Sequence, residues 1–371
     1  MKSIEDLAAA LDAAYPELAA VREASDAPVF LVGGAIRDLL LGRGRADIDL
    51  VVEGDAAELA ARLGAEVVSH ERFATAKVNL DGHEVDIAAA RAETYPHPGS
   101  LPEVAPARLV DDLARRDFTI NAMAIPLQGD VELIDPHGGK ADLEAGALRV
   151  LHPGSFVDDP TRALRGARYA ARFGFEPESE TAALLRAVDL STVSVDRREA
   201  ELLRLAAEAE APKAFGLLAA WGLIAPREGG IALAAEVAEL LSGPQWSEVA
   251  PLDRAVLAAA LGPAGEEAAL AKAHPKRPSQ AVELAAGKSG VELALARAMG
   301  AEWLDRYLSE WRLVSLEIDG EDLIAAGVPE GPALGRGLAE ALRRKLDDEI
   351  SGREEELATA LEAAEGADEL A

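Results

Sequence analysis

Two kinds of hydrophobic pattern divide this sequence, and together they constrain its fold more than any other feature. Between about residues 28 and 135, short β-branched and apolar runs are separated by Gly, Asp and His turns. The runs cover residues 29–32, 48–52, 66–68, 77–80, 84–87 and 118–125. Their period-two alternation predicts a small mixed sheet with helices on one side. From about Pro160 onward, apolar residues recur at three- and four-residue spacing, which predicts an elongated all-helical region.

Chain length and the breaks in this pattern set the expected domain organisation. At roughly 150 residues per domain, a chain of 371 residues corresponds to two or three domains. We therefore predict the α+β class, with three successive parts. These are a mixed-sheet head at residues 1–145, a helical neck at residues 146–210, and a helical body and tail at residues 211–371.

The composition excludes several classes of function. The 37 Lys and Arg residues stand against 66 Asp and Glu, giving a net charge of −29. This charge argues against binding nucleic acid or anionic membrane over the whole surface, but it permits a local basic groove. The absence of cysteine excludes disulfides, thiolate zinc sites and cysteine nucleophiles. No apolar run reaches the roughly 18 residues of a membrane span, and the N-terminal segment lacks a signal-type core, so we expect a soluble, cytoplasmic protein without a membrane partner.

A Gly-Gly turn follows the first predicted strand. Gly33 and Gly34 come directly after residues 29–32, and a helical pattern begins behind them. Glycines at such a turn let backbone N–H groups approach a phosphate closely, and the helix N-terminus adds partial positive charge. Arg37, one turn into the helix, can reach the same phosphates. A tight turn without any ligand fits the two glycines at least as well.

Two acids follow on the second predicted strand. Asp47 and Asp49 are two residues apart, so their side chains share one face of the strand. Neighbouring carboxylates raise each other's pKa unless a cation lies between them. The pair fits either a solvated edge strand or a Mg²⁺ site that carries a nucleotide's phosphates. A third acid would complete a two-metal site for displacement at phosphorus, and Asp86 qualifies because a lone acid inside an apolar run is costly.

Several motifs in a fixed order resemble one family. Residues 33–38 (Gly-Gly-Ala-Ile-Arg-Asp), then Leu-Gly-Arg, then Asp-x-Asp at 47–49, resemble the head of the class II tRNA nucleotidyltransferase and bacterial poly(A) polymerase family. Residues 115–124 (Arg-Arg-Asp-Phe-Thr-Ile-Asn-Ala-Met-Ala) resemble its central motif, and residues 158–162 stand where the family has Glu-Asp-x-x-Arg. Residues 316–335 resemble the family's tail, so the resemblance spans about residues 28–350.

The resemblance implies a DNA polymerase beta-like nucleotidyltransferase head with assigned site residues. The catalytic residues would be Asp47, Asp49 and Asp86, of which the first two hold Mg²⁺ and the third helps to activate the RNA 3′-hydroxyl. The nucleotide would be bound by Gly33, Gly34, Arg37, Arg116, Asp117, Asn121, Asp159, Arg162, Arg165 and Arg168. Within this set, the family places Gly34 and Arg37 at the triphosphate, Asp117 near the ribose, and the last two arginines at the pocket wall or the phosphates.

The choice of base can be argued from Asp159 and Arg162. One turn apart on a predicted helix, they present a carboxylate acceptor and a fork of donors. The carboxylate accepts from the exocyclic amine of cytosine or adenine, whereas uracil and guanine place a carbonyl oxygen there and lose about 1–3 kcal/mol per pairing. Asp159 before Pro160 also fits a helix N-cap. With the neighbouring motifs we favour base recognition and assign the cap to Asp158.

Further arginines follow on the same predicted helix. Arg162, Arg165, Arg168 and Arg172 recur at three- and four-residue spacing. A stripe of this kind is usually a solvated face. Next to the proposed pocket of an otherwise acidic chain, it also suits contact with phosphates.

We therefore predict template-independent transfer of CMP and AMP from CTP and ATP to the 3′ end of tRNA, with release of pyrophosphate and with no protein partner implied. Addition of C-C alone, of the final A alone, or of poly(A) are the alternatives within the family. Residues 92–114 occupy the position of the family's flexible loop and are full-length and rich in Pro and Gly, which argues against C-C addition alone. Transfer to a non-RNA acceptor is disfavoured by the long helical region. A non-catalytic RNA-binding role is disfavoured by the three retained acids and Arg116.

Overall fold

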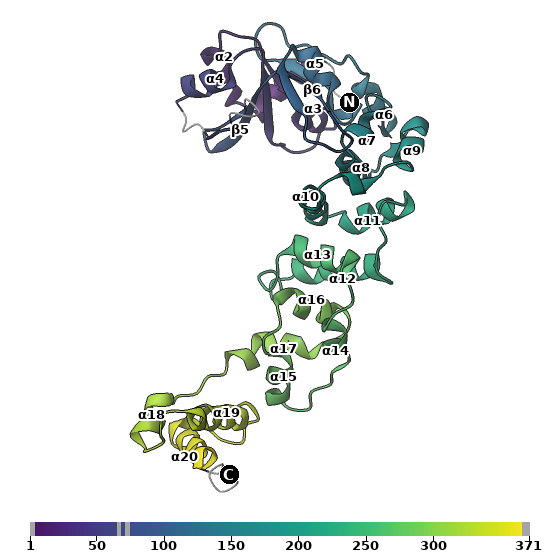
Figure 1. Ribbon diagram of the computed structural model, residues 1–371. Coiled ribbons are helices and arrows are strands. Elements are labelled where there is room, and N and C mark those ends of the chain that lie inside the picture. The colour runs from purple at the N-terminus through teal and green to yellow at the C-terminus, as the bar shows by residue number, and fades with distance from the viewer. Residues whose placement is uncertain (1–3, 65–67, 71–74, 366–371) are drawn as a thin grey trace. The chain divides into compact units, whose positions relative to one another are not determined.

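The computed structural model describes residues 4–64, 68–70 and 75–365 (Figure 1). The chain divides into two compact units, residues 1–225 and residues 226–371. The finer division into head, neck, and body with tail stays a prediction. None of the helices in the described ranges combines the length and the apolar character needed to cross a bilayer.

Six strands of the first unit form one mixed sheet within the described residues, in the order β3-β4-β5-β2-β1-β8. Their bounds are β1 Val29–Val32, β2 Ile48–Val52, β3 Val68–His70, β4 Thr75–Leu80, β5 His83–Ala89 and β8 Ala124–Pro126. Strands β2 and β5 run parallel, and the other neighbouring pairs run antiparallel. The predicted mixed sheet is confirmed. Because β2 lies inside it, the edge-strand alternative is excluded for Asp49, the acid on β2.

Two of the predicted strand runs differ from the structure. Three of the eight residues in the run at 118–125 form the short 3₁₀ helix η2 (Thr119–Asn121), because the backbone N–H groups of Asn121 and Ala122 donate to the carbonyls of Phe118 and Thr119. Only its end contributes to β8. Of the run at residues 66–68, only the last residue lies in the described part of the chain, where it begins β3.

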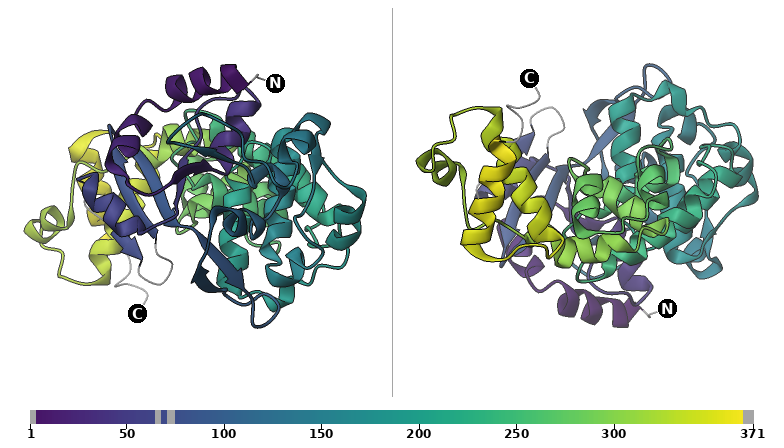
Figure 2. Two further views of the ribbon diagram at one scale, coloured as in Figure 1. Left: turned by 90° about the horizontal axis from the view of Figure 1, so that it is seen from above. Right: turned by 90° about the horizontal axis from the view of Figure 1, so that it is seen from below.

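Helices cover both faces of the sheet, so the prediction of helices on one side is wrong. The core of the first face includes residues of the helices α1 Ile4–Ala14, α2 Leu18–Ala24, α3 Gly34–Leu40 and α4 Ala56–Arg62. Helix α1, in purple beside the N-terminus, lies at the outside of the first unit in both views of Figure 2, and it packs against α3. On the second face, α5 (Leu109–Ala114) buries Leu109 and Leu113 against Val32 and Val51. Strand β1 is buried along its whole length, and such a strand needs cover on both sides.

The alternation along β2 decides which face carries the acids. Ile48 and Leu50 enter the core on the side of α1 to α4, so Asp49 shares the opposite face with Val51. That is the face on which α5 packs. The chain leaves α5 at Arg115, so the two arginines of the central motif enter on the same side as the acid.

The remaining elements of the first unit follow in the chain. They are β6 Arg91–Thr94, β7 Glu103–Pro106, α6 Gly139–Ala145, β9 Ala147–Leu148, α7 Ser155–Asp158, α8 Thr161–Phe173, β10 Glu176–Pro177, α9 Ser179–Leu185, η3 Leu190–Thr192, α10 Val195–Ala206 and α11 Ala211–Ala220. Several of them, including α6, α8 and α9, add residues to the core of the first face. Strands β6 and β7 pair as an antiparallel hairpin. Residues 92–114, predicted as a flexible loop, therefore hold this hairpin and α5. Helix α8 packs against α10 and α11.

The second unit is helical in its described residues. Its elements are α12 Gly230–Ser242, α13 Leu252–Leu261, α14 Glu267–Lys272, α15 Pro278–Ala285, α16 Gly290–Ala298, α17 Trp303–Ser309, η4 Trp311–Leu313, α18 Gly320–Ala325, α19 Pro332–Leu346 and α20 Gly352–Glu365. The last three helices bury a separate core that includes Leu323, Ala341 and Ala360. The predicted helical region is confirmed, apart from the two-residue strand β10, which pairs with β9.

Gly139 provides a test of how the fold supports η2. A Cβ added there would lie 2.2 Å from the Thr119 carbonyl oxygen, so α6 and η2 touch through this glycine. We predict that Gly139→Ala lowers the free energy of unfolding by about 1–3 kcal/mol, because backbone has to move. Urea unfolding of the full chain followed by circular dichroism measures it.

The matched control is the same substitution at Gly216, inside α11. A Cβ there meets nothing within 4 Å. Gly216→Ala should therefore stabilise the chain by about 0.5–1 kcal/mol, since alanine loses less backbone entropy in a helix. Equal unfolding midpoints for the Gly139 variant and the unaltered chain would contradict the close contact.

Candidate functional site

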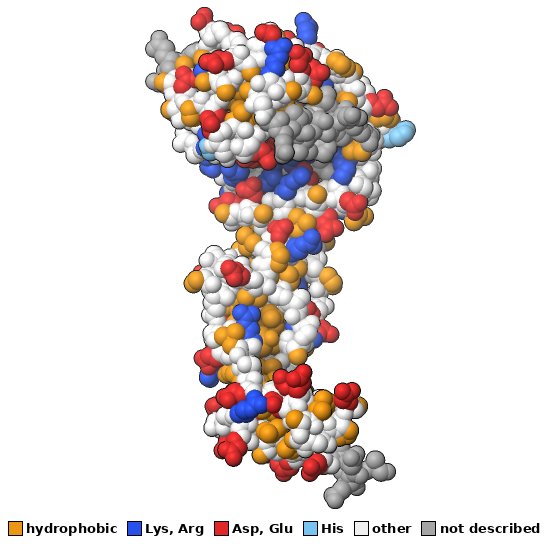
Figure 3. All heavy atoms as spheres, turned by 90° about the vertical axis from the view of Figure 1, so that its left-hand side faces the viewer, with side chains coloured by type: hydrophobic (Ala, Val, Ile, Leu, Met, Phe, Trp, Pro, Cys, Tyr) orange, Lys and Arg blue, Asp and Glu red, His pale blue; other side chains and the backbone are white. Residues whose placement is uncertain are grey.

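A cleft of about 490 Å³ opens in the first unit, lined by β2, β5, β6, α8 and the segment between α5 and η2. Lys and Arg side chains gather in a hollow beneath the sheet on the face shown in Figure 3. The predicted residues that line the cleft are Asp49, Asp86, Arg116, Asp117, Asn121, Asp159, Arg162 and Arg165. The predicted residues outside the lining are Gly33, Gly34, Arg37, Asp47 and Arg168. The structure therefore brings most of the predicted set together.

Asp49 and Asp86 lie side by side because β2 and β5 pair in parallel, with these two residues opposite each other. Asp47 lies one residue before β2 and is exposed. The sequence argument that Asp86 is a costly acid inside an apolar run is wrong. Its side chain is 45% exposed and lies 3.3 Å from the Lys77 ammonium, because the alternation of β5 turns it away from the buried Val85.

The environment of Asp49 disfavours its charge. Burial raises the pKa of Asp49 to about 6, and the nearby carboxylates of Asp86 and Asp47 add to the rise, while Arg116 opposes it. A buried carboxylate with acidic neighbours is stabilised in its charged form by a divalent cation.

These acids fit a magnesium site that a ligand completes. In the described ranges, no three His, Cys, Asp or Glu side chains lie close enough to hold a metal ion by themselves. Mg²⁺ is commonly held by one or two carboxylates together with substrate phosphates, so a full cage is not required. Gly33 keeps the space beside Asp49 open: a Cβ there would lie 3.5 Å from Asp49 Oδ2 and 3.1 Å from Arg116 Nη1.

Arg37 is a largely buried cation, and one of its three guanidinium nitrogens has no hydrogen-bond partner among the described residues. Its side chain is 6% exposed, Nε donates to Asp38 Oδ1 at 2.9 Å, and Nη1 donates to Asn121 Oδ1 at 2.7 Å. Among the described residues Nη2 has no hydrogen-bond partner, and a Cβ on Gly34 would lie 3.3 Å from it. The Nη2 amino group beside Gly34 therefore remains as a donor for an anion, as the triphosphate prediction requires.

Asp112 on α5 holds both arginines of the central motif, and the sequence analysis missed it. Its buried carboxylate accepts from Arg115 at 2.7 Å and from Arg116 at 2.9 Å. Burial alone would raise the pKa of Asp112, but the two guanidinium groups outweigh it and lower the pKa. The spacing of three and four residues on a helical pattern was the available signal.

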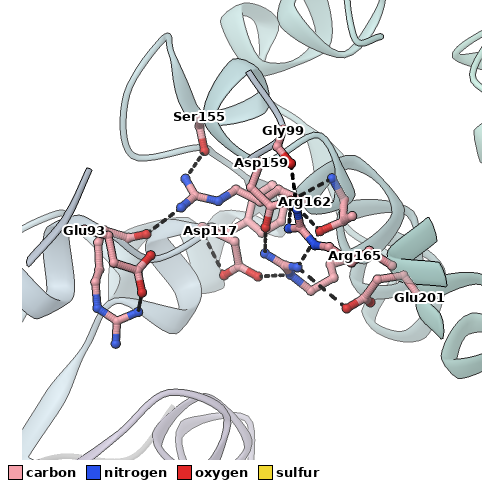
Figure 4. A network of polar contacts seen from close by, with 12 residues as sticks. Glu93, Gly99, Asp117, Ser155, Asp159, Arg162, Arg165 and Glu201 are labelled. Atoms are coloured by element: carbon pink, nitrogen blue, oxygen red, sulfur yellow. Dashed lines mark hydrogen bonds and ion pairs between the residues drawn. The ribbon is translucent and has the colours of Figure 1, made fainter. Parts of the chain in front are cut away.

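Arg165 lies between three acids (Figure 4). Its Nε donates to Asp117 Oδ2 at 3.0 Å, Nη2 donates to Asp159 Oδ2 at 3.4 Å, and Nη1 lies 3.7 Å from Glu201 Oε1. Burial alone would lower the pKa of Arg165, but the three carboxylates outweigh it and raise the pKa. The guanidinium is thus charged and fixed in place. Glu201 on α10 supports it from outside the cleft lining.

The Asp117 carboxylate accepts hydrogen bonds from three neighbouring residues. Its Oδ1 accepts from the Phe118 N–H at 2.9 Å and from Asn121 Nδ2 at 3.0 Å, while Oδ2 holds Arg165. Burial opposes ionisation, but Arg165 and Asn121 outweigh it and lower the pKa of Asp117. Its visible role is to position Arg165, and its predicted contact with a ribose stays a prediction.

Asp159 has two structural partners as well as a place on the cleft. Its Oδ1 accepts from Thr161 N at 3.1 Å and from Arg197 Nη2 at 3.0 Å. The cap assigned to Asp158 is therefore wrong, because Asp159 satisfies the N–H at the start of α8. Burial alone would raise the pKa of Asp159. The charge of Arg165, the hydrogen bond from Thr161 and the charge of Arg197 outweigh burial, so the pKa of Asp159 is lowered. Oδ2 keeps only the long contact to Arg165.

Arg162 is 3% exposed and is held from three sides. Nη1 donates to Ser155 Oγ at 2.7 Å, and Nη2 donates to the Arg115 carbonyl at 2.7 Å and to the Tyr95 hydroxyl at 3.4 Å. Its buried Nε has no partner among the described residues. Figure 4 shows the guanidinium directed toward Ser155 and away from Arg165.

The sequence analysis missed Glu93 and Tyr95 on the hairpin side of the cleft. Glu93 accepts from the Tyr95 hydroxyl at 2.8 Å and from Arg115 Nη1 at 2.7 Å. Burial raises the pKa of Tyr95 to about 12, and its hydrogen bond to Glu93 adds to the rise, so the hydroxyl stays protonated. Residues 91, 93 and 95 alternate along one strand face, which was the available signal.

The raised pKa of Asp49 can be tested by measuring the stability of a variant that lacks this charge. Without a cation, Asp49→Asn should stabilise the chain at pH 8 by at most about 3 kcal/mol, because it removes a charge that burial disfavours. The folded carboxyl has the raised pKa, so its cost is complete above about pH 6 and shrinks as the pH falls below that value. The cost disappears only below the ordinary pKa of 3.8, which makes the gain at pH 5 clearly smaller than at pH 8. Thermal unfolding with a chelator at pH 5 and pH 8 measures it, and equal gains at both pH values would contradict this account.

The chain matches a family model and several relatives. Residues 29–149 match the model described as Poly A polymerase head domain. An A-adding tRNA nucleotidyltransferase of Halalkalibacterium halodurans is 45% identical over 203 residues, which span 51% of this chain and 48% of the relative. A CC-adding tRNA nucleotidyltransferase of Deinococcus radiodurans is 35% identical over 360 residues, 93% of this chain and 92% of the relative.

Solved structures agree with these matches. A CCA-adding enzyme in an apo form superposes with a TM-score of 0.79 at 32% identity, covering 96% of this chain and 98% of that chain. Other CCA-adding enzymes of similar fold were solved with tRNA, with ATP and with CTP. With the head model matched and one relative aligned over nearly its whole length, this chain belongs to the family of tRNA nucleotidyltransferases and poly(A) polymerases.

Proposed function

We propose that this protein transfers CMP and AMP from CTP and ATP to the 3′ end of tRNA and releases pyrophosphate. One observation carries the proposal: a single cleft is lined by the Asp49–Asp86 pair of the sheet and by Asp159 and Arg162 at the start of α8. The first pair suits phosphate chemistry, and the second suits recognition of a base.

The reacting end of the cleft is built from the two strands and the Gly-Gly turn. Mg²⁺ held by Asp47 and Asp49 would supply charge stabilisation at the α-phosphate and lower the pKa of the attacking hydroxyl. Asp86, in register with Asp49, would accept the hydrogen bond of the RNA 3′-hydroxyl and orient it. The Gly34 backbone and Arg37 Nη2 would bind the triphosphate, and Arg116 would offset the charge that develops beside Asp49.

The base end replaces a template strand with protein groups. Asp159 carries a fixed negative charge, so it accepts from the exocyclic amine of cytosine or adenine and meets a carbonyl oxygen in uracil or guanine. Arg165 and Arg197 hold this carboxylate from two sides. A rigid acceptor discriminates more sharply than a mobile one, because it cannot turn away from a mismatched base.

The relatives support this reaction class and differ in their products. Their printed names include A-adding and CC-adding enzymes, and the solved neighbours are CCA-adding enzymes. Addition of C-C alone is the second candidate, because a CC-adding relative aligns over 93% of this chain. Residues 92–114, which hold β7, α5 and most of β6, support the full reaction, since the family resemblance places a flexible loop there and implies that CC-only members shorten it.

The direct test uses three acceptors: tRNA ending before CCA, after C, and after C-C, each with labelled CTP or ATP. We predict incorporation of C into the first two and of A into the third. Asp47→Ala should abolish incorporation while the circular dichroism spectrum stays unchanged, because this acid is exposed and its loss leaves the core intact. Incorporation of neither nucleotide would overturn the proposal, and C without A would establish the second candidate.

The base-recognition account predicts the effect of Asp159→Asn. The amide keeps an oxygen for the Thr161 N–H but presents a donor where the base amine is expected, so discrimination against UTP should fall about 10- to 100-fold. Ratios of kcat/KM for CTP and UTP measure it. Asp158→Asn is the matched control, since it removes the same charge one residue away and outside the cleft lining. Unchanged discrimination in the Asp159 variant would contradict the account.

A further inference from the structure

Three arginines surround one aromatic ring at the far end of α8. The guanidinium carbons of Arg37, Arg43 and Arg172 lie 4.5, 4.7 and 5.4 Å from the centre of the Phe173 ring. They come from α3, the turn after α3, and α8. We call this set the Phe173 cluster. Cations packed on a ring face are attracted by its quadrupole, but they also repel one another, so such a group favours an anion nearby.

The carboxylates near the Phe173 cluster do not neutralise it. Asp38 is 3% exposed, is hydrogen-bonded to Arg37, and lies 3.9 Å from Arg172. Glu208 is shared at 3.7 Å from Arg172 and 3.8 Å from Arg168, too far for hydrogen bonds. No carboxylate of the described chain lies within ion-pair distance of Arg43, which is exposed. In a protein of net charge −29, this group carries a local excess of positive charge.

The Phe173 cluster adjoins the cleft along α8, although none of its four residues belongs to the cleft lining. Tyr169 lines the cleft, and its ring stacks on Phe173 with 6.3 Å between centroids and 26° between planes. Arg37 contacts both rings. At 1.5 Å per residue, Arg172 lies about 10 Å along the helix from Arg165, a distance that polyphosphate spans. Arg168, whose buried Nε lacks a hydrogen-bond partner in the described chain, stands between them.

The order of groups along α8 gives the direction of a bound nucleotide. The proposed base-reading residues Asp159 and Arg162 stand where α8 begins, whereas the arginines follow toward its C-terminal end. With the base at the start of the helix, the phosphates beyond the α-phosphate extend toward the Phe173 cluster. An RNA backbone phosphate would offer the same oxyanion chemistry to these arginines.

We propose that Arg43 and Arg172 form a binding site for the leaving pyrophosphate beside the cleft, linked to its lining by Arg37, which contacts both Tyr169 and Phe173. This inference rests on the proposed function. Arginine offers paired donors to phosphate oxygens, and both side chains are open to solvent while resting on Phe173. The site draws the product away from the reacting acids, toward the surface of a chain whose other surfaces repel it.

The test is titration of the full chain with inorganic pyrophosphate, followed by calorimetry. The double variant Arg43→Ala/Arg172→Ala should weaken pyrophosphate binding about tenfold or more, since each charge-assisted contact supports about that much affinity. The matched control is Arg22→Ala/Arg62→Ala, which removes two ion-paired, partly exposed arginines on α2 and α4. It should bind pyrophosphate as the unaltered protein does. If the alanine variant unfolds, Arg43→Lys/Arg172→Lys keeps the charge and should show an intermediate loss.

Enzyme assays separate this inference from the proposed function. In the double variant, the inhibition constant of pyrophosphate should rise by the same factor as its dissociation constant, while the KM for tRNA stays unchanged. Unchanged pyrophosphate binding overturns the inference, and so does a loss confined to tRNA, which would assign these arginines to the RNA backbone. If the unaltered protein transfers no nucleotide, the proposed function fails, and the titration still reports whether the site exists.

Discussion

The structure depends above all on two carboxylates that the sheet forces together. Parallel pairing of β2 with β5 sets Asp49 opposite Asp86, and burial raises the pKa of Asp49 to about 6. This arrangement costs stability, and nothing in the packing of the sheet requires it. Two neighbours suit this pair to binding a charged ligand. Arg116, just after α5, offsets negative charge, and Gly33 leaves space beside Asp49. Strain of this kind, kept by surrounding structure, is typical of functional sites.

A second constraint joins the sheet to α8. Arg165 is held by Asp117 from the head and by Asp159 and Glu201 from the helical side, so the proposed phosphate and base ends form one connected set of charges. Removing one member would leave another buried charge unpaired, which is more costly than the pair itself is stabilising. The network therefore serves to hold geometry. A carboxylate fixed in this way would let the protein read a base without a template strand, as we propose.

Much of the fold was predictable, and the reasons are local. The alternation at residues 48–52 and 84–87 identified β2 and β5. The shared face of Asp47 and Asp49 stays a prediction, because Asp47 lies one residue before β2. Long-range facts were not accessible in this way. The parallel register of β2 and β5, the cover of α5 on the second face, and the exposure of Asp86 depend on how distant segments meet. Asp112 and Glu93 were missed because an acid near arginines usually indicates a solvated ion pair. Asp159 could not be assigned to a single role from the sequence, because its side chain both accepts from the N–H of Thr161 at the start of α8 and lines the cleft.

The measurement that tests the central claim most directly is a crystal structure of the protein with Mg²⁺ and a non-hydrolysable CTP analogue. The account predicts the α-phosphate beside Asp49 and Asp86, the cytosine amine at Asp159 Oδ2, and the terminal phosphates beyond Arg168 on α8. A nucleotide bound in the reverse orientation, or outside the cleft with the two strand acids left without ligand, would contradict it.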